Sequence, residues 1–337
     1  MKKIKNLFLR VFFLLSRMLF EQYFFLLEKK FSYLNTSTGF IHSGKKIDVS
    51  TPIFKDIDYL PRPDGSNISI CILDYKKIRA TKRLLESIPL SFNGEINILS
   101  QGNDEKHVHE LRKFVEKFQK VNLYVEVQNL GIAAGRNFLF GKSKQPWILS
   151  LDNDIVFKES PFQHLTNLIF QTNTKFANLS FSDGVNKPNN GANLVFENAS
   201  QGAIAKLSWA PAPSNFQSIS REDFIFLGNA LNGGASLYNK EVFQNLGGFD
   251  ERFRFALEDL DFSLRLVLSG YKVANSNFHS LFHLHDNSNE PVEIAYEKEH
   301  SNLEKYLSAD SILIQKYNAS FVDENFRRWL TSRNSRA

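Results

Sequence analysis

Trp-Ile-Leu-Ser-Leu-Asp-Asn-Asp-Ile-Val-Phe, residues 147–157, is the stretch that decides the fold. The apolar run Trp147–Leu151 predicts a buried strand that ends where Asp152, Asn153 and Asp154 begin. Carboxylates two positions apart on an extended chain project to the same side and repel each other, and burial increases the repulsion. A divalent cation removes that conflict, and oxygen donors at this spacing suit Mg²⁺ or Mn²⁺. A solvated turn after a strand is the alternative, so the rest of the sequence must decide.

Apolar strands alternate with helices along the chain that leads up to this stretch. The predicted strands are Ile68–Leu73, Ile96–Leu99 and Leu123–Val127, and the predicted helices are Thr81–Ile88, Glu105–Lys120 and the segment after Asn129-Leu130-Gly131. The alternation predicts an α/β fold built on a mostly parallel sheet with right-handed crossovers. Because ligands of such sheets bind beyond the carboxyl ends of the strands, we expect the residues that follow the strands to converge. They are Asp74, Ser100, Asn129 and Asp152.

The chain after residue 160 is less regular. Lys175–Asp223 contains Gly, Asn, Pro and Ser throughout, so we expect an irregular region over the site. The predicted helices here are Phe162–Gln171, Lys240–Leu246 and Leu257–Ser269. Acidic residues open the last of them, where the helix dipole favours negative charge; they are Glu258, Asp259 and Asp261. Asp261 lies four residues before Arg265, which predicts a structural ion pair on the helix surface.

Length and composition allow one large α/β domain with extensions. The 337 residues are 42% apolar, which is typical of a globular chain and excludes a disordered one. Cys71 is the only cysteine, which excludes an internal disulfide and a cysteine-cluster zinc site. The net charge of +5 is compatible with an anionic membrane surface or a phosphorylated substrate. We expect an amphipathic helix at 1–34, a linker at 35–66, the main domain at 67–290 and a helical extension at 291–337.

The first 34 residues differ in composition from the rest. Ile4–Leu27 is dense in Phe and Leu, and polar residues recur along it at helical intervals. It has no charge-free span near the roughly 20 residues that cross a bilayer, and no small-residue cleavage site. The pattern predicts an amphipathic helix in the membrane interface, anchored by Lys3, Arg10 and Arg17 among others. A helix packed on the domain's own core, or on a second subunit, is the alternative.

Several short motifs together resemble the GT-A glycosyltransferases of the family 2 type. In the family's order, the matching pieces are Ile68–Tyr75, Asn129–Gly131 with Ala134–Asn137, Leu151–Asp154, Gly233–Leu237 with Gly247–Glu251, Glu258–Asp261 and His283. Each piece alone is weak, but their order and spacing over about residues 67–288 make the signal strong. The sequence departs from the family at Ser100, which stands where an Asp often contacts the nucleotide base. The identity of the base is therefore open.

The resemblance implies a metal site and a donor site. It implies that Asp152 and Asp154 bind Mn²⁺ or Mg²⁺ and that His283 is a further ligand. His285 is the alternative to His283, because the two alternate along an extended segment and share a face. Arg136 is expected to contact the donor diphosphate with its planar guanidinium. The other residues expected at the nucleotide sugar are Asp74, Ser100, Asn137, Asp152 and Gly234.

The resemblance also implies the chemistry. Asp259 takes the position of the general base in similar inverting enzymes, and Glu258 is the alternative base or a group that orients the acceptor. We therefore expect a metal-dependent inverting glycosyltransferase that moves a sugar from a nucleotide-diphosphate sugar to a glycan or lipid-linked acceptor. We expect a role in surface polysaccharide synthesis, a cytoplasmic location on the inner face of the plasma membrane, and no nucleic-acid partner.

Two other functions compete with this interpretation. A nucleotidyltransferase also uses a carboxylate-bound metal on an α/β sheet, but it gives no reason for the Glu258-Asp259 pair beside a Gly-Gly loop. A non-catalytic scaffold that binds sugar or lipid belongs to a different class. The presence of Asp152, Asp154 and Asp259 argues against a scaffold, because binding alone does not require them.

Overall fold

The computed structural model describes residues 40–42, 45–46, 62–182, 188–189, 191–197, 205–211, 224–284, 296, 298–299, 301–324, 326–328 and 330. The predicted N-terminal helix at 1–34 and the alternative metal ligand His285 lie outside these residues. None of the helices in the described ranges combines the length and the hydropathy that crossing a bilayer requires.

A four-stranded parallel unit forms one half of the main sheet. Its neighbouring strands are, in order, β6 (Trp147–Leu151), β3 (Ile68–Asp74), β4 (Glu95–Gln101) and β5 (Val121–Glu126). The first of these four strands in the sequence, β3, lies between β6 and β4, so the chain builds outward from β3 through β4 and β5 before it returns to the other side as β6. The strand order reverses between β3 and β6, and in open α/β sheets this is where ligands bind. The parallel sheet that the sequence predicts is confirmed.

The other half of the main sheet is mixed. Antiparallel β14 (Ala235–Asn239) pairs with β6 and joins the parallel unit to the remaining strands, which are β8 (Phe176–Asn178), β15 (Val273–Ser276), β13 (Phe224–Gly228), β1 (Phe40–His42) and β2 (Lys45–Lys46). The strands β1 and β2 lie within the segment that the sequence predicts to be a linker. Residues 40–42 pair with β13 instead and extend the sheet edge.

Two small sheets complete the strand structure. One contains β10 (Pro188–Asn189), β9 (Ser180–Ser182), β16 (His279–His283) and β7 (Ile155–Phe157), and the other contains β11 (Ala192–Glu197), β12 (Ala205–Pro211) and β17 (Ala319–Ser320). The sequence predicts that residues 175–223 are irregular. Their described parts instead contribute short strands to both small sheets, and they contribute β8 to the main sheet. Their Gly and Pro content hides the pattern, because these strands are short and obtain their partners from distant parts of the chain.

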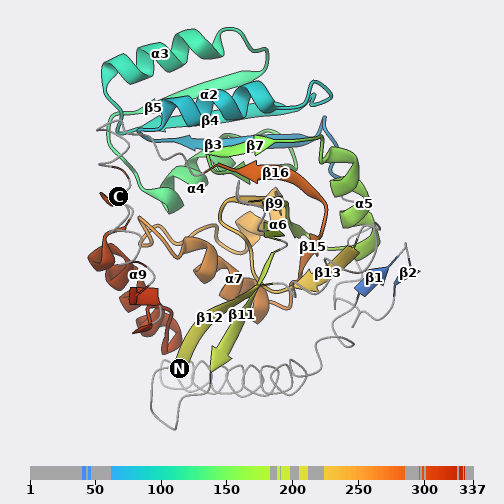
Figure 1. Ribbon diagram of the computed structural model, residues 1–337, viewed down its shortest axis with the longest axis vertical. Coiled ribbons are helices and arrows are strands. Elements are labelled where there is room, and N and C mark those ends of the chain that lie inside the picture. Colours follow the sequence, from blue (N-terminus) through green and yellow to red (C-terminus); the bar gives the residue numbers. More distant parts are fainter. Residues whose placement is uncertain are drawn as a thin grey trace, which may run out of the picture.

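Helices cover both faces of the main sheet, and alternate residues of β3 show how. Ile68, Ile70 and Ile72 face a core formed with α2 (Ile78–Ser87), α3 (Glu105–Val115) and α5 (Phe162–Thr172). Cys71 points the other way, into a core formed with α4 (Ile132–Lys142), α6 (Lys240–Asn245) and α7 (Glu258–Leu268). Figure 1 shows α3 above the parallel strands and α4 below them.

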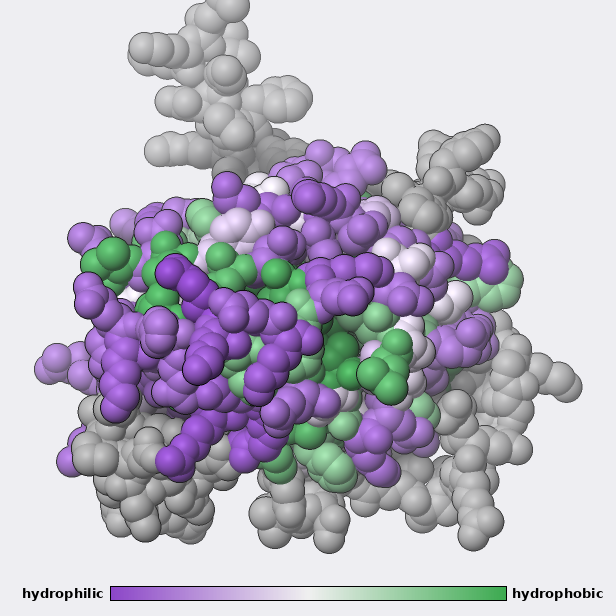
Figure 2. Space-filling model, turned by 90° about the horizontal axis from the view of Figure 1, so that it is seen from above, coloured by the Kyte–Doolittle hydropathy of each residue, from purple (hydrophilic) through white to green (hydrophobic). Residues whose placement is uncertain are grey.

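The C-terminal part of the chain packs beside the second core. The helix α9 (Leu303–Tyr317) lies within the segment for which the sequence predicts a helical extension. Leu313 on α9 is buried with Phe253 and Leu260 around α7. Seen from above the parallel strands, the surface is mostly hydrophilic with small groups of hydrophobic side chains (Figure 2). Small scattered apolar groups of this kind are ordinary on a protein surface.

Candidate active site

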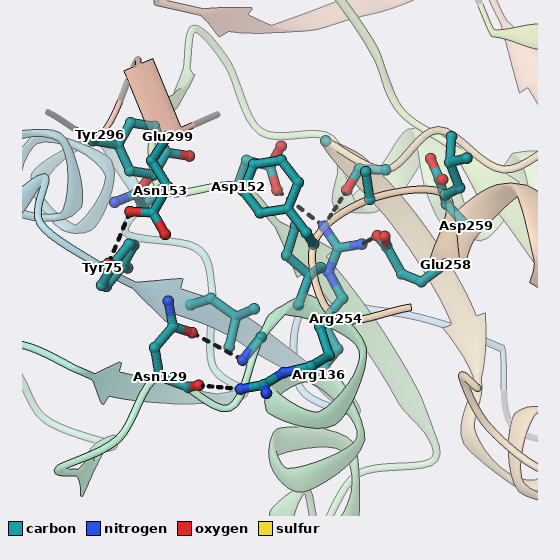
Figure 3. Close-up of a pocket in the computed structure, with 18 of the residues that line it drawn as sticks. Tyr75, Asn129, Arg136, Asp152, Asn153, Arg254, Glu258, Asp259, Tyr296 and Glu299 are labelled. Atoms are coloured by element: carbon teal, nitrogen blue, oxygen red, sulfur yellow. Dashed lines mark hydrogen bonds and ion pairs between the residues drawn. The ribbon is translucent and has the colours of Figure 1, made fainter. Parts of the chain in front are cut away.

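A cavity of about 600 Å³ opens at the carboxyl ends of β3 and β6. Its wall comes from segments that are far apart in sequence, including the loops after β3 and β6, the start of α4, the Gly233-Gly234 loop and the start of α7. Residues 296–326 supply the remaining wall with aromatic and acidic side chains. Figure 3 shows ten of these residues from several elements pointing into one space. The convergence at strand ends that the sequence predicts is confirmed for Asn129 and Asp152.

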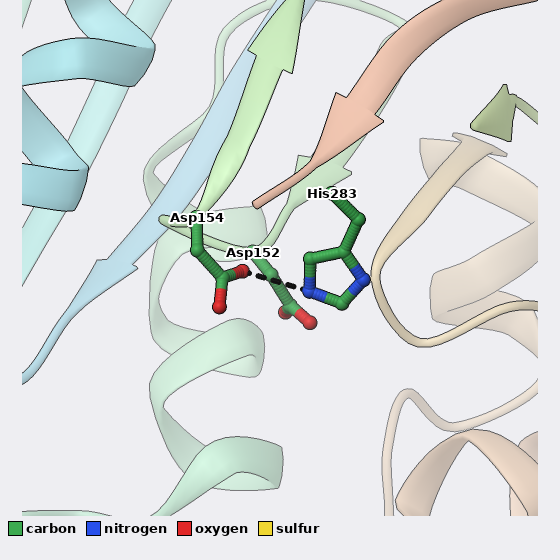
Figure 4. A group of neighbouring side chains, drawn as sticks. All are labelled: Asp152, Asp154 and His283. Carbon is green, nitrogen blue, oxygen red and sulfur yellow. Dashed lines mark ion pairs between the residues drawn. The ribbon is translucent and has the colours of Figure 1, made fainter. Parts of the chain in front are cut away.

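Asp152, Asp154 and His283 form a group with the composition of a metal site. One ligand atom from each lies within 4.8 Å of the others, and Figure 4 shows the three side chains facing one another. The sheet brings them together, because β7 follows Asp154 directly and pairs antiparallel with β16, whose last residue is His283. The Leu284 amide donates to the Asp154 carbonyl at 2.9 Å, which fixes this register at the site.

The donor atoms of this group fit a hard divalent cation. Two carboxylates and an imidazole suit Mn²⁺ and are compatible with Mg²⁺. Without a metal, His283 Nε2 lies 3.0 Å from Asp154 Oδ1. Burial of the ring opposes protonation, but the hydrogen bond to Asp154 and the charges of Asp154 and Asp152 together outweigh it and raise the pKa of His283. A bound cation would replace the proton that these two side chains now share.

Arg136 links the metal group to the start of α7. Its Nη2 donates to Asp152 Oδ1 at 3.0 Å and to the Gly233 carbonyl at 2.6 Å, and its Nη1 donates to Glu258 Oε1 at 2.6 Å. The side chain is almost fully buried. Burial alone would lower the pKa of Arg136, but Glu258 and Asp152 raise it, so the guanidinium stays charged. The sequence predicts a diphosphate contact for Arg136, whereas the structure shows most of its donors already occupied by protein acceptors.

Glu258 and Asp259 differ in accessibility although they are neighbours. Glu258 is 4% exposed and its carboxylate is held by Arg136, while Asp259 is only partly buried. Burial raises the pKa of both carboxyl groups, to about 8 for Glu258, where the Asp259 charge adds to the effect and Arg136 opposes it. Leu257, just before them, has a left-handed backbone with φ of +68°. A leucine in that conformation is strained, and strain of this kind is concentrated at functional sites.

The Gly233-Gly234 loop lies between the metal group and Asp259. Because β14 pairs with β6, the Asp152 amide donates to the Gly234 carbonyl at 2.9 Å. A Cβ on residue 233 would lie 2.8 Å from Asp259 Oδ2, so any other residue at that position would push the Asp259 carboxylate away. The glycine therefore lets the Asp259 carboxylate lie against the loop. Gly234 lines the cavity, at the position the resemblance implies for it.

Asp74 and Ser100 are placed behind the cavity wall. Neither side chain has exposed surface. Asp74 accepts hydrogen bonds from Thr81 at 2.7 Å, from Ser100 at 2.9 Å and from Asn103 at 3.0 Å, and lies 2.8 Å from His107 Nε2. The direct nucleotide contacts expected of Asp74 and Ser100 are therefore not supported by this structure. The cluster instead ties α2 and α3 to the strand ends.

Asn137 also has a supporting position. Its amide donates to the Phe249 carbonyl at 2.9 Å, and its oxygen accepts from the Phe249 amide at 2.9 Å. This pair of bonds fixes the turn after α6 against α4, and Asn137 is not part of the cavity wall among the described residues. In this structure Asn137 joins two motifs of the sequence, and the donor contact expected of it stays a prediction.

The structure adds cavity residues that sequence analysis did not identify. Lys77 is buried, with Nζ 3.9 Å from Asp154 Oδ2 and 4.3 Å from the Tyr296 ring centre. Glu299 bridges Lys76 at 3.1 Å and Lys305 at 2.8 Å. Partial burial opposes its charge, but these two lysines outweigh it and lower the pKa of Glu299 to about 2. Lys76 and Lys77 follow the end of a predicted strand, and that position could have identified them as cavity residues. No local sequence pattern identifies Tyr296 or Glu299.

Asp261 pairs with Arg265 as predicted, but its setting is different. Arg265 Nε donates to Asp261 Oδ2 at 3.0 Å. The carboxylate has no exposed surface, and it also accepts from Lys316 and, at 2.8 Å, from the Tyr317 hydroxyl. Lys316 also contacts Asp250 at 2.9 Å. The predicted surface pair is therefore the centre of a buried network between α7 and α9.

Known proteins resemble this chain in sequence and in fold. Residues 70–331 match the family model described as "Glycosyltransferase like family 2". An "Uncharacterized glycosyltransferase" of Haemophilus influenzae is 27% identical over 251 residues, which is 69% of this chain and 76% of that protein. The crystal structure of GalNAc-T7 with UDP, GalNAc and Mn²⁺ superposes with a TM-score of 0.52 at 13% identity. The match covers 81% of this chain and 55% of GalNAc-T7, so the chain spans about half of that protein's length. At this identity, the similarity concerns the fold, which is the GT-A fold.

Proposed function

We propose that this chain, which belongs to the glycosyltransferase family 2-like proteins and is a glycosyltransferase, transfers a sugar with inversion of configuration. The donor in this proposal is a nucleotide-diphosphate sugar, and the acceptor is a hydroxyl group of a glycan or a lipid-linked glycan. The supporting observation is one cavity that holds the Asp152–Asp154–His283 group and the Asp259 carboxylate, with Arg136 and the Gly233-Gly234 loop between them.

The donor side of the cavity is suited to a diphosphate. Asp152, Asp154 and His283 would hold Mn²⁺ or Mg²⁺, which as a Lewis acid stabilises the charge that develops on a leaving diphosphate. Lys77 is a second source of positive charge, because it is buried beside Asp154 and lines the cavity. Arg136 contributes differently: it orients Asp152 and neutralises Glu258. A low-dielectric wall strengthens each of these interactions.

The base in the proposed mechanism is Asp259. Its carboxylate accepts the proton of the acceptor hydroxyl while the acceptor oxygen bonds to the anomeric carbon and the bond to the diphosphate oxygen breaks. Glu258 is the weaker candidate, because one of its oxygens is bound to Arg136 and the side chain is buried. Burial raises the pKa of the Asp259 carboxyl group, and a carboxylate with a raised pKa is the stronger proton acceptor.

The cellular setting is the remaining part of the proposal. We place the enzyme in the cytoplasm, on the inner face of the plasma membrane, where it builds a surface polysaccharide. The support is the apolar, helical pattern of residues 1–34 with its basic side chains and the net charge of +5.

The test is a panel of UDP-, GDP- and CDP-sugars, each with and without Mn²⁺, scored for hydrolysis and for transfer to simple glycosides. We expect one nucleotide to support turnover with Mn²⁺ and little turnover after chelation. Nuclear magnetic resonance of the first product gives its anomeric configuration. A product with retained configuration would remove the need for Asp259 as a base and contradict the inverting mechanism.

A further inference from the structure

Four aromatic side chains form one wall of the cavity. They come from three separate parts of the chain: Phe255 precedes α7, Tyr306 lies on α9, and Phe321 and Phe326 follow β17. Tyr306 contacts Phe255 with ring centres 5.8 Å apart and Phe326 with ring centres 5.1 Å apart, and Phe321 contacts Phe326 at 5.3 Å. We call these four residues the aromatic wall. The rings meet at steep angles of 60° to 87°, so they form a faceted surface and not a flat stack.

The aromatic wall is fixed from behind. Tyr306 and Phe321 are only 7% and 8% exposed, and the wall packs on buried apolar residues of α9 and of the chain end. Lys305 Nζ lies 4.4 Å from the centre of the Phe255 ring and also binds Glu299, which helps to fix the position of Phe255. A surface that is already ordered loses little entropy when a ligand binds to it. The wall is therefore a prepared contact surface and does not need to rearrange.

The wall is close to the proposed base through the chain itself. Phe255 comes four residues before Asp259, and the strained Leu257 turns the chain between them. Both Phe255 and Asp259 line the same cavity. The Ile132 amide also donates to the Arg254 carbonyl at 2.7 Å, and a Cβ at Gly131 would lie 2.3 Å from that carbonyl. The loop that carries Phe255 is thus held against the start of α4, which also carries Arg136.

The charge of the cavity indicates which acceptors fit. Among the described residues, the lining contains five acidic side chains, those of Asp152, Asp154, Glu258, Asp259 and Glu299, against the basic side chains of Lys77, Arg136, Arg254 and His283. A divalent metal balances this excess, and the donor diphosphate then adds negative charge. A further anion, such as the phosphate of a lipid carrier, would be repelled from the base. A long alkyl chain is also disfavoured, because Glu299 and Arg254 would lose hydration beside it.

We propose that the aromatic wall binds an uncharged pyranose ring of the acceptor and holds its hydroxyl group toward Asp259. One face of such a ring carries C–H bonds, which pack on the electron-rich faces of aromatic rings, while its hydroxyl groups meet polar residues at the edge. Phe255, Tyr306 and Phe326 then determine which acceptor is used. This inference rests on the proposed function and adds the chemical class of the acceptor to it.

The test is saturation-transfer nuclear magnetic resonance on the full chain with Mn²⁺ and the nucleotide diphosphate, UDP, GDP or CDP, that calorimetry shows to bind. The probes are the methyl glycosides of glucose, galactose, mannose and N-acetylglucosamine, with glycerol 3-phosphate and decanol as the anionic and alkyl arms. We expect transfer to the ring C–H protons of at least one glycoside. We expect Phe255→Leu and Phe326→Leu each to weaken that binding about tenfold, because leucine keeps apolar volume without an aromatic face.

Matched controls separate this inference from the proposed function. Phe170→Leu is the matched control, because Phe170 is an exposed aromatic residue of α5 that does not line the cavity. It should bind the glycoside as the wild type does, and all variants should keep the nucleotide affinity of the wild type. If no nucleotide binds with Mn²⁺, the proposed function fails, and this inference fails with it. If a nucleotide binds but no glycoside does, if only glycerol 3-phosphate or decanol binds, or if the leucine variants bind glycosides normally, then the inference alone is overturned.

Discussion

At the scale of single residues, Arg136 is the side chain on which the site depends most. Its three acceptors lie 16, 97 and 122 residues away in the sequence. Removing the guanidinium would leave Glu258 buried and unpaired, and an uncompensated buried charge costs several kcal/mol. The same arrangement separates the two acidic neighbours, because Arg136 holds Glu258 and leaves Asp259 open to the cavity.

Asp154→Asn tests the metal group. We expect the variant to fold normally, because Asp154 keeps its backbone bond to Leu284, and to lose most of its activity, because the group loses one of its two anionic ligands. Calorimetry with UDP, GDP and CDP, each with and without Mn²⁺, should show metal-dependent nucleotide binding in the wild type that is weakened in the variant. Equal binding of all three nucleotides without metal would contradict the assignment.

Asp259→Asn tests the base. Asparagine keeps the shape and cannot accept the proton, so we expect the transfer rate to fall by about 10²–10⁴ while donor affinity stays nearly unchanged. Glu258→Gln is the matched comparison, since it sits one residue away and is bound to Arg136. Transfer rates and donor affinities of both variants decide the question. Near-normal transfer by Asp259→Asn, together with lost transfer in Glu258→Gln, would assign the base to Glu258.

At the scale of elements, α9 holds the helix α7 through Asp261, which lies on a different side of the first turn from Glu258 and Asp259. Asp261 receives Arg265 of its own helix and both Lys316 and Tyr317 of α9, while Lys316 also contacts Asp250. The first turn of α7 thus contains Glu258 and Asp259, which face the cavity, and Asp261, which faces α9. The helix dipole favours an acid at each of these three positions equally. The three side chains nevertheless have different partners, because they point in different directions around the helix axis.

Asp261→Asn should act on stability. The substitution leaves Lys316 and Arg265 without their buried counter-charge, so we expect a loss of about 3 kcal/mol or more in the free energy of unfolding. Glu110→Gln is the control, because it breaks the exposed Lys82–Glu110 ion pair and should cost less than about 1 kcal/mol. Urea unfolding of the two variants measures both values. Equal, small losses would show that the α7–α9 network contributes little.

The contact between the C-terminal segment and the loop after β3 depends on pH, because it includes the carboxylate of Glu299. Its pKa is about 2 in the folded protein against an ordinary value of 4.5, so the ion pairs with Lys76 and Lys305 stabilise the fold above pH 4.5. That contribution should decline as the pH falls from 4.5 toward 2. Urea midpoints between pH 2 and 7 for the wild type and Glu299→Gln should differ at neutral pH and converge in acid. A difference that is constant with pH would rule out this ion pair as its source.

At the scale of the whole molecule, the sheet order places the parts of the site. The strands β3 and β6 open the crevice, β14 brings the Gly233-Gly234 loop beside Asp152, and β16 brings His283 to Asp154. Residues 296–326 complete the cavity from the other side. The donor wall thus combines residues from the first half of the chain with the Gly233-Gly234 loop and His283, and much of the proposed acceptor wall comes from Tyr306, Phe321 and Phe326.

Deleting residues 1–34 tests the proposed membrane location. The motive is the amphipathic pattern of that segment, with an apolar face wide enough to enter the interface. We expect the full chain to sediment with anionic vesicles and the shortened chain to remain in solution, with transfer to a soluble acceptor retained. If the full chain stays in solution as a monomer without detergent, the proposal is wrong. If it stays in solution as a defined oligomer, the segment joins subunits instead.

The sequence by itself determined the parallel unit and the place of the acidic pair at its edge. β3 and β6 are apolar and almost entirely buried, and Asp152 and Asp154 follow β6 at the sheet edge where ligands bind, while the order of the other motifs decided against a solvated turn. Only the tertiary structure decided which matched residues face the cavity. Asp74, Ser100 and Asn137 have the right positions in the chain, but their side chains are used by neighbouring elements. Tyr296 and Glu299 carry no local signal, because they meet Lys77 and Tyr75 across more than two hundred residues. The aromatic wall carries none either, because its rings come from three separate parts of the chain, and no periodicity records that.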